Sequence, residues 1–274
     1  ISSKIIVDDI QAYIHYPKYN FIYDKLWLSK SQDMPSGPMG IYPSSYPIIF
    51  KPIVNLFGMS RGFKKICTID EYDDAIKDGY FWQPFLTGHH YCVDIVLNKG
   101  KLLFYSVLKS IPGTHGEFKC HYTVLDWIIP DKIMKWIQTY MKDYEGCMNL
   151  EIIDDYIIEG HLRLNGDFHL YNLDFCRQLS ELYESNFNNA LVIDYKVPKK
   201  YLFPIFINKT NMNHFLSKKK IITNILKKNE RVYTYYFDIL NSINQGHFIR
   251  CVMFDTNDYT SGHTLKQFIE NLLN

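Results

Sequence analysis

The sequence predicts an α+β protein with an additional small α/β unit at its C-terminal end. Three observations lead to this fold class. Short segments in which apolar and polar residues alternate are separated by turn residues, as is typical of antiparallel strands. An apolar period of about 3.6 runs through 126–144, which predicts a helix. From 190 onward, strand and helix patterns alternate.

Composition limits the possible partners. The chain has 274 residues, 47% of them hydrophobic, which is enough for one large core or two modest domains. Its formal net charge is +1, from 30 basic and 29 acidic residues, so no overall field attracts nucleic acid or an acidic membrane. The sequence has no apolar run near the roughly 18 residues that span a bilayer. We therefore expect no nucleic acid and no membrane among the partners, and any anion site must be local.

Six dispersed cysteines indicate a reducing compartment. The sequence contains no Cys-x-x-Cys pair and no short-chain disulfide pattern, so we expect reduced thiols, a cytoplasmic protein and no cysteine-cluster zinc site. The cysteines are Cys67, Cys92, Cys120, Cys147, Cys176 and Cys251.

The first half of the chain is predicted to be mainly strands. Tyr46-Pro-Ile-Ile-Phe-Lys51-Pro52 is a short apolar strand that ends at a proline, and a glycine-bearing loop leads from it to another strand. Thr68, with Glu71 three residues later, predicts the start of a short helix. Beyond Gly79, strands are expected at 80–86, 91–97 and 101–108, with turns at Thr87-Gly88 and Asn98-Lys-Gly100 that make 80–97 a strand, turn, strand unit.

The second half alternates between helices and strands. The helix at 126–144 has Pro130 near its first turn and Gly146 just past its end. A further helix is expected at 175–187, and 186–189 is a polar break that we interpret as a boundary. The elements expected after it are strands at 201–207, 232–239 and 248–255 and helices at 216–228 and 264–273.

The most informative stretch is 151–163. Asp154-Asp155 separates two β-branched runs, which predicts a hairpin with a short turn. In that hairpin Glu151 and Glu159 can face each other, and the period of two puts Glu159, His161 and Arg163 on one face. Two acids, an imidazole and a guanidinium could then converge on an anion and its counter-cation. A solvated sheet face carries the same alternation, so this pattern needs support from elsewhere in the chain.

Four motifs follow one another in an order that resembles the ATP-grasp fold. They are the Lys51-Pro52 strand, the loop Asn55-Leu-Phe-Gly58-Met-Ser60-Arg61-Gly62, the segment Gln83-Pro-Phe-Leu86-Thr-Gly88-His-His90, and the hairpin that ends in Glu159-x-His161-x-Arg163. The resemblance covers about residues 22–175. It implies two α+β subdomains that clasp a nucleotide, with ATP and Mg²⁺ as cofactors.

The resemblance also implies roles for individual residues. Lys51 and Lys25, the latter within Asp24 to Lys30, would bind phosphate, and the flap residues Gly58, Ser60 and Arg61 would close over the phosphates. Gln83, Leu86 and His90 would form the adenine hinge and ribose site. Glu151, Glu159 and His161 would hold the metal, and Lys51, Lys109 and Arg163 would act in catalysis.

Three positions depart from the family pattern. Gln83 and His90 stand where the family has glutamates, and both can still accept a hydrogen bond. His161 stands where the family has asparagine. Because Mg²⁺ prefers oxygen ligands and imidazole suits Mn²⁺ or softer metals, either the metal site is altered or His161 contacts phosphate or substrate instead.

The resemblance predicts a division into four parts: an N-terminal segment at 1–45, a small subdomain at 46–108, a large subdomain with the metal hairpin at 109–189, and an α/β unit at 190–274. The small α/β domain that normally comes first in the family is missing. We expect either that the unit at 190–274 takes its part or that a preceding domain has been removed.

The implied activity is that of an ATP-dependent ligase, which phosphorylates an acceptor carboxylate and joins it to an amine or a similar nucleophile. The acceptor would be a small molecule or a peptide. With three substituted positions, two alternatives remain: a catalytically degenerate relative that binds a nucleotide or a partner, and a kinase on the same fold. The sequence does not indicate the oligomeric state.

Overall fold

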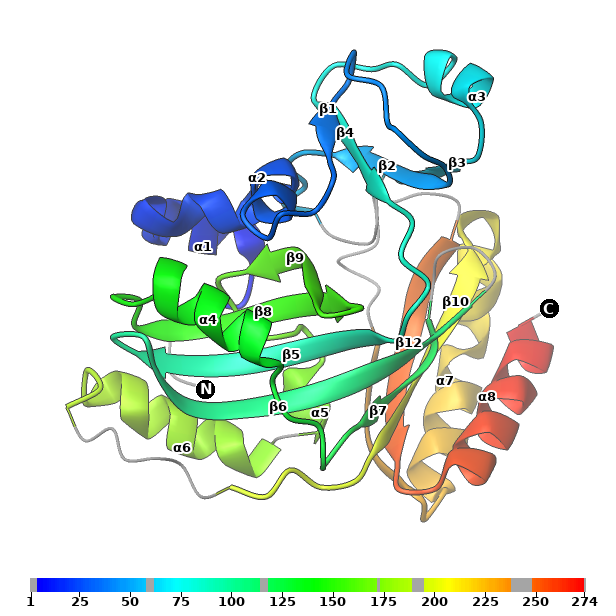
Figure 1. The fold of residues 1–274 in the computed structure, drawn as a ribbon. Helices are drawn as coiled ribbons and strands as arrows, with labels where there is room; N and C mark the ends of the chain where they lie inside the picture. The colour runs from blue at the N-terminus through cyan, green and yellow to red at the C-terminus, as the bar shows by residue number, and fades with distance from the viewer. Residues whose placement is uncertain are drawn as a thin grey trace. The chain divides into compact units, whose positions relative to one another are not determined.

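The computed structural model describes residues 4–57, 62–113, 118–171, 173–188, 195–237 and 248–273 (Figure 1). The chain forms two compact units. The first comprises 1–107, 126–168 and 174–196, and the second comprises 108–125, 169–173 and 197–274. The four-part division that the resemblance implies stays a prediction.

A small antiparallel sheet forms one part of the first unit, in the strand order β1-β4-β2-β3. Its strands are β1 (Gly37–Pro38), β2 (Ile48–Pro52), β3 (Lys64–Ile66) and β4 (Tyr80–Pro84). The predicted sequence of strand, loop and strand around Lys51 is confirmed, because β2 pairs with β3. The predicted helix start is confirmed too: Thr68 caps α3 (Ile69–Asp73) by accepting a hydrogen bond from the amide of Glu71.

The second sheet in this unit has the order β6-β5-β8-β9. Its strands are β5 (His90–Asn98), β6 (Lys101–Pro112, which continues into the second unit), β8 (Gly146–Ile153) and β9 (Tyr156–His161). The strands predicted at 80–86 and 91–97 are both present, but they do not pair with each other as one unit, because β4 and β5 lie in different sheets. β4 pairs with β1 along one edge and with β2 along the other, which leaves β5 to pair with β8.

Both hairpins of this sheet turn through two residues with positive φ. Lys99 (φ 48°) and Gly100 (φ 73°) join β5 to β6, and Asp154 (φ 51°) and Asp155 (φ 59°) join β8 to β9. Positive φ at both central residues is the geometry that matches the twist of paired strands. The turns predicted at these two places are confirmed.

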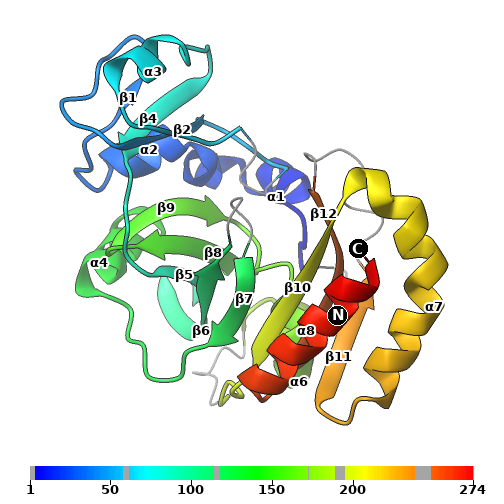
Figure 2. The same cartoon turned by 90° about the vertical axis from the view of Figure 1, so that its right-hand side faces the viewer.

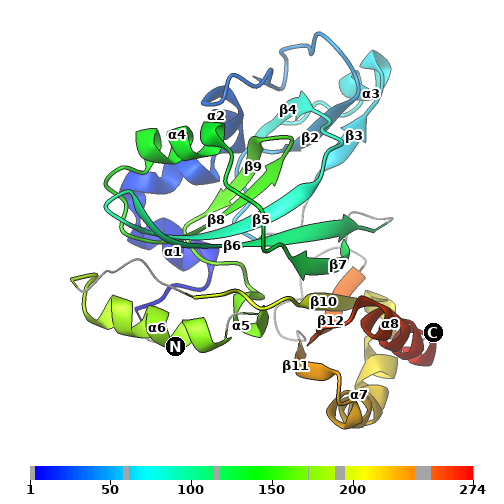
Figure 3. The ribbon, with the colours of Figure 1, turned by 60° about the horizontal axis from the view of Figure 1, so that its bottom comes forward.

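Helices cover both faces of this sheet. Figures 1 and 3 show α1 (Asp9–His15) and α2 (Lys25–Lys30) on the side of the β8–β9 hairpin, and α6 (Leu173–Glu184) on the opposite side, where Phe175 stacks on Phe104 of β6. The 3₁₀ helix η1 (Pro17–Tyr23) joins α1 to α2. Helix α4 (Asp131–Tyr140) is shorter than the predicted 126–144, because Pro130 is extended (ψ 143°) and Met141 leaves the helical conformation.

The second unit consists of antiparallel strands with two long helices (Figure 2). Its order is β11-β12-β10-β7-β6, formed by the end of β6 with β7 (Phe118–Thr123), β10 (Tyr201–Asn208), β11 (Val232–Phe237) and β12 (Phe248–Thr256). Helices α7 (Met212–Lys228) and α8 (Tyr259–Leu273) pack against β10 and β12 through a common apolar core. Two short helices, α5 (Phe168–Tyr171) and η2 (Lys209–Asn211), come before α7 in the chain. The predicted strand and helix order is confirmed, although both long helices begin earlier than expected. That this unit is an addition to the fold stays a prediction.

Candidate functional site

Polar side chains cover one face of three neighbouring strands, β5, β8 and β9. Directly opposite residues in antiparallel strands share a face, so the strand register defines two rows across the sheet. One row consists of Cys92, Glu151 and Glu159, and the next consists of Asp94, Asn149 and His161. Asn149 donates to Asp94 (3.0 Å), and both side chains are buried. This face is polar, with Asp94, Asn149 and His161 buried and the two glutamates partly exposed.

A β-bulge in β9 sets the register of the hairpin. Ile152 pairs with Ile157 but Glu151 pairs with Glu159, so Ile158 is an extra residue without a partner in β8. A two-residue turn without a bulge would have placed Glu151 opposite Ile158. The bulge therefore brings the two glutamates face to face, as the sequence interpretation expected, and shifts His161 onto the same face.

The predicted metal ligands are brought together. His161 Nε2 lies 3.8 Å from Glu159 Oε1 and 4.0 Å from Glu151 Oε1. Its other ring nitrogen, Nδ1, lies 3.0 Å from Asp9 Oδ1, and this hydrogen bond assigns the proton to Nδ1 when the imidazole is neutral. The Nε2 lone pair is then directed to the side of the glutamates. The two carboxylates and the imidazole on this side are ligand types that a divalent cation takes, and the nitrogen donor favours Mn²⁺ over Mg²⁺.

Asp9 is a site residue that the sequence interpretation missed. Its carboxylate is buried and also accepts from Arg163 Nη2 at 2.6 Å. Burial alone would raise the pKa of Asp9, but the hydrogen bonds and charges of His161 and Arg163 hold that pKa below its ordinary value. Asp9 lies in the first turn of α1, 152 residues from His161, and local sequence carries no signal for this contact.

Two buried lysines approach the hairpin from α2 and β2. Lys25, just after the capping residue Asp24, forms an ion pair with Glu159 (2.9 Å). Lys51 Nζ donates to the carbonyl of the bulge residue Ile158 (2.9 Å). Burial, followed by repulsion from Lys25, lowers the pKa of Lys51 to about 8. Both lysines that were predicted to bind phosphate therefore lie beside the predicted metal ligands.

The predicted hinge lies along β4 and the connection to β5. Gln83 is buried and accepts a hydrogen bond from Ser29 of α2 (3.1 Å), while Leu86 is half-buried in the connection. At the far end of this connection, His90 Nε2 lies 3.0 Å from Glu151 Oε2. Burial favours the neutral acid, but the His90 hydrogen bond and the nearby positive charges hold the pKa of Glu151 well below its ordinary range.

The remaining predicted site residues are the three flap residues and Lys109. Gly58, Ser60 and Arg61, the proposed flap, lie outside the described residues. Lys109 is half-buried on β6, opposite Tyr122, and belongs to the second unit, so its role stays a prediction.

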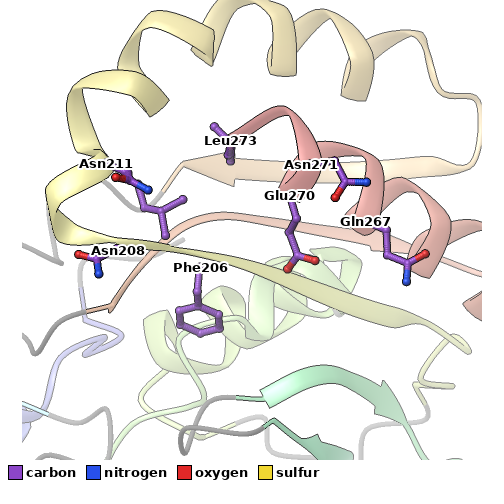
Figure 4. A pocket seen from close by; sticks show the side chains of 8 residues that line it. Phe206, Asn208, Asn211, Gln267, Glu270, Asn271 and Leu273 are labelled. Atoms are coloured by element: carbon purple, nitrogen blue, oxygen red, sulfur yellow. The ribbon is translucent and has the colours of Figure 1, made fainter.

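A separate hollow of about 610 Å³ lies in the second unit, where the end of β10 meets α8 (Figure 4). Its lining is mostly polar and shares no residue with the predicted site. The lining residues are Phe206, Ile207, Asn208, Asn211, Gln267, Glu270, Asn271 and Leu273.

All six cysteines are free thiols, as predicted, and only Cys67 among them is exposed. Among the described residues, the helices are too short or too polar to cross a membrane.

Solved structures resemble this chain, although no protein-family model and no curated protein sequence matches it. An L-amino acid ligase from Bacillus licheniformis has a TM-score of 0.60 and 12% identity over 95% of this chain and 72% of its own. A carboxyaminoimidazole ribonucleotide synthase from Aspergillus clavatus, complexed with ATP, has a TM-score of 0.64 and 13% identity. The match covers 93% of this chain and 73% of the synthase. A biotin carboxylase from Campylobacter jejuni has a TM-score of 0.54 and 12% identity, and the match covers 93% of this chain and 71% of the carboxylase. Identities this low show the fold alone.

Proposed function

We propose that this chain, which has the ATP-grasp fold, binds ATP with a divalent cation and activates a carboxylate for attack by an amine or a similar nucleophile. The observation that carries the proposal is the convergence of Glu151, Glu159 and His161 beside two buried lysines. The similar structures, which include a ligase and an ATP complex, support it. The free thiols support a cytoplasmic location.

The lysines are the proposed phosphate ligands. A buried ammonium without a full counter-charge is costly, and within the described residues the hydrogen-bond acceptor of Lys51 is a backbone carbonyl. A triphosphate would supply the missing negative charge. Lys25 would exchange its bond to Glu159 for a bond to phosphate, which releases that carboxylate to hold a cation.

Glu151, Glu159 and His161 are the proposed cation ligands. A divalent cation bound there would neutralise charge on the transferred phosphoryl group. Asp9 keeps the Nδ1 proton of His161 in place, and the same carboxylate positions Arg163 by its 2.6 Å contact. The chain's own contribution is therefore alignment and charge stabilisation, with Arg163 and the lysines on the anionic reactants.

The proposed reaction has two steps. A carboxylate oxygen of the acceptor attacks the γ-phosphorus of ATP, the bond from that phosphorus to the bridging oxygen breaks, and ADP leaves with an acyl phosphate as the other product. The lone pair of an amine then attacks the acyl carbon, inorganic phosphate leaves, and the amine loses one proton to a base as the amide forms.

Hydroxylamine provides the test. The purified chain is incubated with ATP, Mg²⁺ or Mn²⁺, hydroxylamine and pools of amino acids and other small carboxylic acids, and hydroxamate, ADP and phosphate are measured. We expect hydroxamate and ADP in equal amounts, and loss of both in Glu159→Gln. Formation of AMP and pyrophosphate would contradict the proposal.

A binding-only function is the second candidate. It is favoured by the 2.6 Å contact between Asp9 and Arg163, which already neutralises the proposed catalytic guanidinium, and by the substituted positions Gln83, His90 and His161. In that case ATP binds, but no ADP forms with any carboxylate pool. ADP formation without hydroxamate, on adding an alcohol pool, would instead indicate a kinase.

A further inference from the structure

A second group of metal-binding side chains lies at one end of the polar face. His90 and Cys92 are two residues apart on β5 and so share a face, and Cys92 is directly opposite Glu151 on β8. One ligand atom from each of these three residues lies within 4.8 Å of the others, and His90 Nε2 is 3.0 Å from Glu151 Oε2. The sequence pattern indicated a dispersed thiol for Cys92 and assigned His90 to the ribose site.

The donor types separate this group from the proposed ATP-linked cation site. Mg²⁺ takes oxygen ligands, whereas a thiolate selects softer metals, and imidazole, thiolate and carboxylate together are typical zinc ligands. Three protein ligands with an open fourth position is the arrangement of many reactive zinc sites. Tetrahedral bonds to zinc place the donors roughly 3.5 Å from one another, so these donors, all within 4.8 Å of one another, need only a small adjustment to bind the ion. The rotatable side chains of Glu151 and His90 permit this movement.

We propose that His90, Cys92 and Glu151 bind Zn²⁺. This inference does not depend on the proposed function, because the three donors are held by the pairing of β5 with β8, whether or not ATP binds. The two sites share Glu151. Zinc at this site therefore withdraws one carboxylate from the cation that accompanies ATP, so Zn²⁺ and the magnesium complex of ATP compete for the chain.

Metal titration of the whole chain tests the proposal. ZnCl₂ is titrated into the reduced, metal-free protein by calorimetry, and Co²⁺ is added in parallel because cobalt bound to a thiolate gives a charge-transfer absorption. We expect one zinc ion per chain and a thiolate-to-cobalt band. Loss of a residue that only hydrogen-bonds to a metal ligand weakens metal binding roughly 10- to 100-fold. Cys92→Ser and His90→Gln remove a ligand itself, so each should weaken zinc binding by more than that. The matched controls are Cys67→Ser and His89→Gln, which change an exposed thiol and an exposed imidazole and should retain parental affinity.

Urea unfolding of each metal-free variant accompanies the titrations, because Cys92 is buried. If Cys92→Ser fails to fold, His90→Gln and the cobalt spectrum of the parent decide the question. The proposal is overturned if the parent binds no zinc, or if either folded variant binds zinc as the parent does. It is also overturned if zinc binding is lost in His161→Asn but retained in Cys92→Ser, which would place the ion at the neighbouring site.

Discussion

Replacing Lys51 with methionine should make the protein more stable and a poorer nucleotide binder. Lys51 is 9% exposed, and burial with repulsion from Lys25 lowers its pKa from 10.5 to about 8. Methionine keeps much of the apolar stem and removes the buried charge. A structural lysine would give the opposite result for stability, because its loss would remove a stabilising contact.

The expected magnitude follows from the pKa. A folded pKa of about 8 against 10.5 in the unfolded chain means that the charged lysine destabilises the fold by about 3 kcal/mol below pH 8. This penalty disappears as pH rises from about 8 to 10.5, because there the unfolded chain binds the proton and the folded chain does not. Methionine also removes the charge-assisted hydrogen bond to the Ile158 carbonyl, worth about 2 kcal/mol. The net stabilisation by Lys51→Met at pH 7 is therefore about 1 kcal/mol.

Two assays measure the two effects. Urea unfolding at pH 7 gives the change in free energy of unfolding, and calorimetric titration with ATP gives the change in affinity, expected at 1.5–3 kcal/mol or roughly 10- to 100-fold weaker. Lys64→Met, an exposed lysine on β3, is the control and should change neither quantity. Lower stability with unchanged ATP affinity in Lys51→Met would refute the reasoning.

Three further predictions concern the same group of residues. ATP affinity of the parent should fall as pH rises through about 8, because Lys51 then loses its charge, and titrations across this range should show a flatter profile in Lys51→Met. Glu159→Gln should abolish the dependence of ATP binding on Mg²⁺ while leaving some metal-free binding; an unchanged dependence would mean that the hairpin is only a polar sheet face. Asp9→Asn should weaken Mn²⁺ binding roughly 10- to 100-fold, because His161 loses the partner that orients it, and spin resonance of free Mn²⁺ measures this. Equal Mn²⁺ affinity in Asp9→Asn and the parent would remove Asp9 from the site.

Local patterns predicted most of the elements but not all of their pairings. The Asp154-Asp155 turn and the capping of α3 by Thr68 were predictable because their determinants lie within a few residues. The separation of β4 from β5 was not predictable in this way. It depends on β1 and β2 occupying both edges of β4, and β1 consists of only two residues, with no alternation that would mark it as a strand.

The candidate site shows the same limit. Glu159 and His161 share a face by simple alternation, but their alignment with Glu151 depends on the bulge at Ile158, and the β-branched run there carries no sign of an extra residue. Asp9 was missed because its partners lie in another part of the chain. Cys92 was missed as a candidate ligand because its neighbours in the sheet, not in the sequence, complete the donor set.

Calorimetric titration of the parent chain with ATP, with Mg²⁺ or Mn²⁺ and without metal, tests nucleotide binding directly. We expect one ATP per chain, tighter binding with either metal, and no metal effect when Glu151 and Glu159 are both changed to glutamine. Absence of ATP binding in the folded parent chain, with or without metal, would contradict the proposed function.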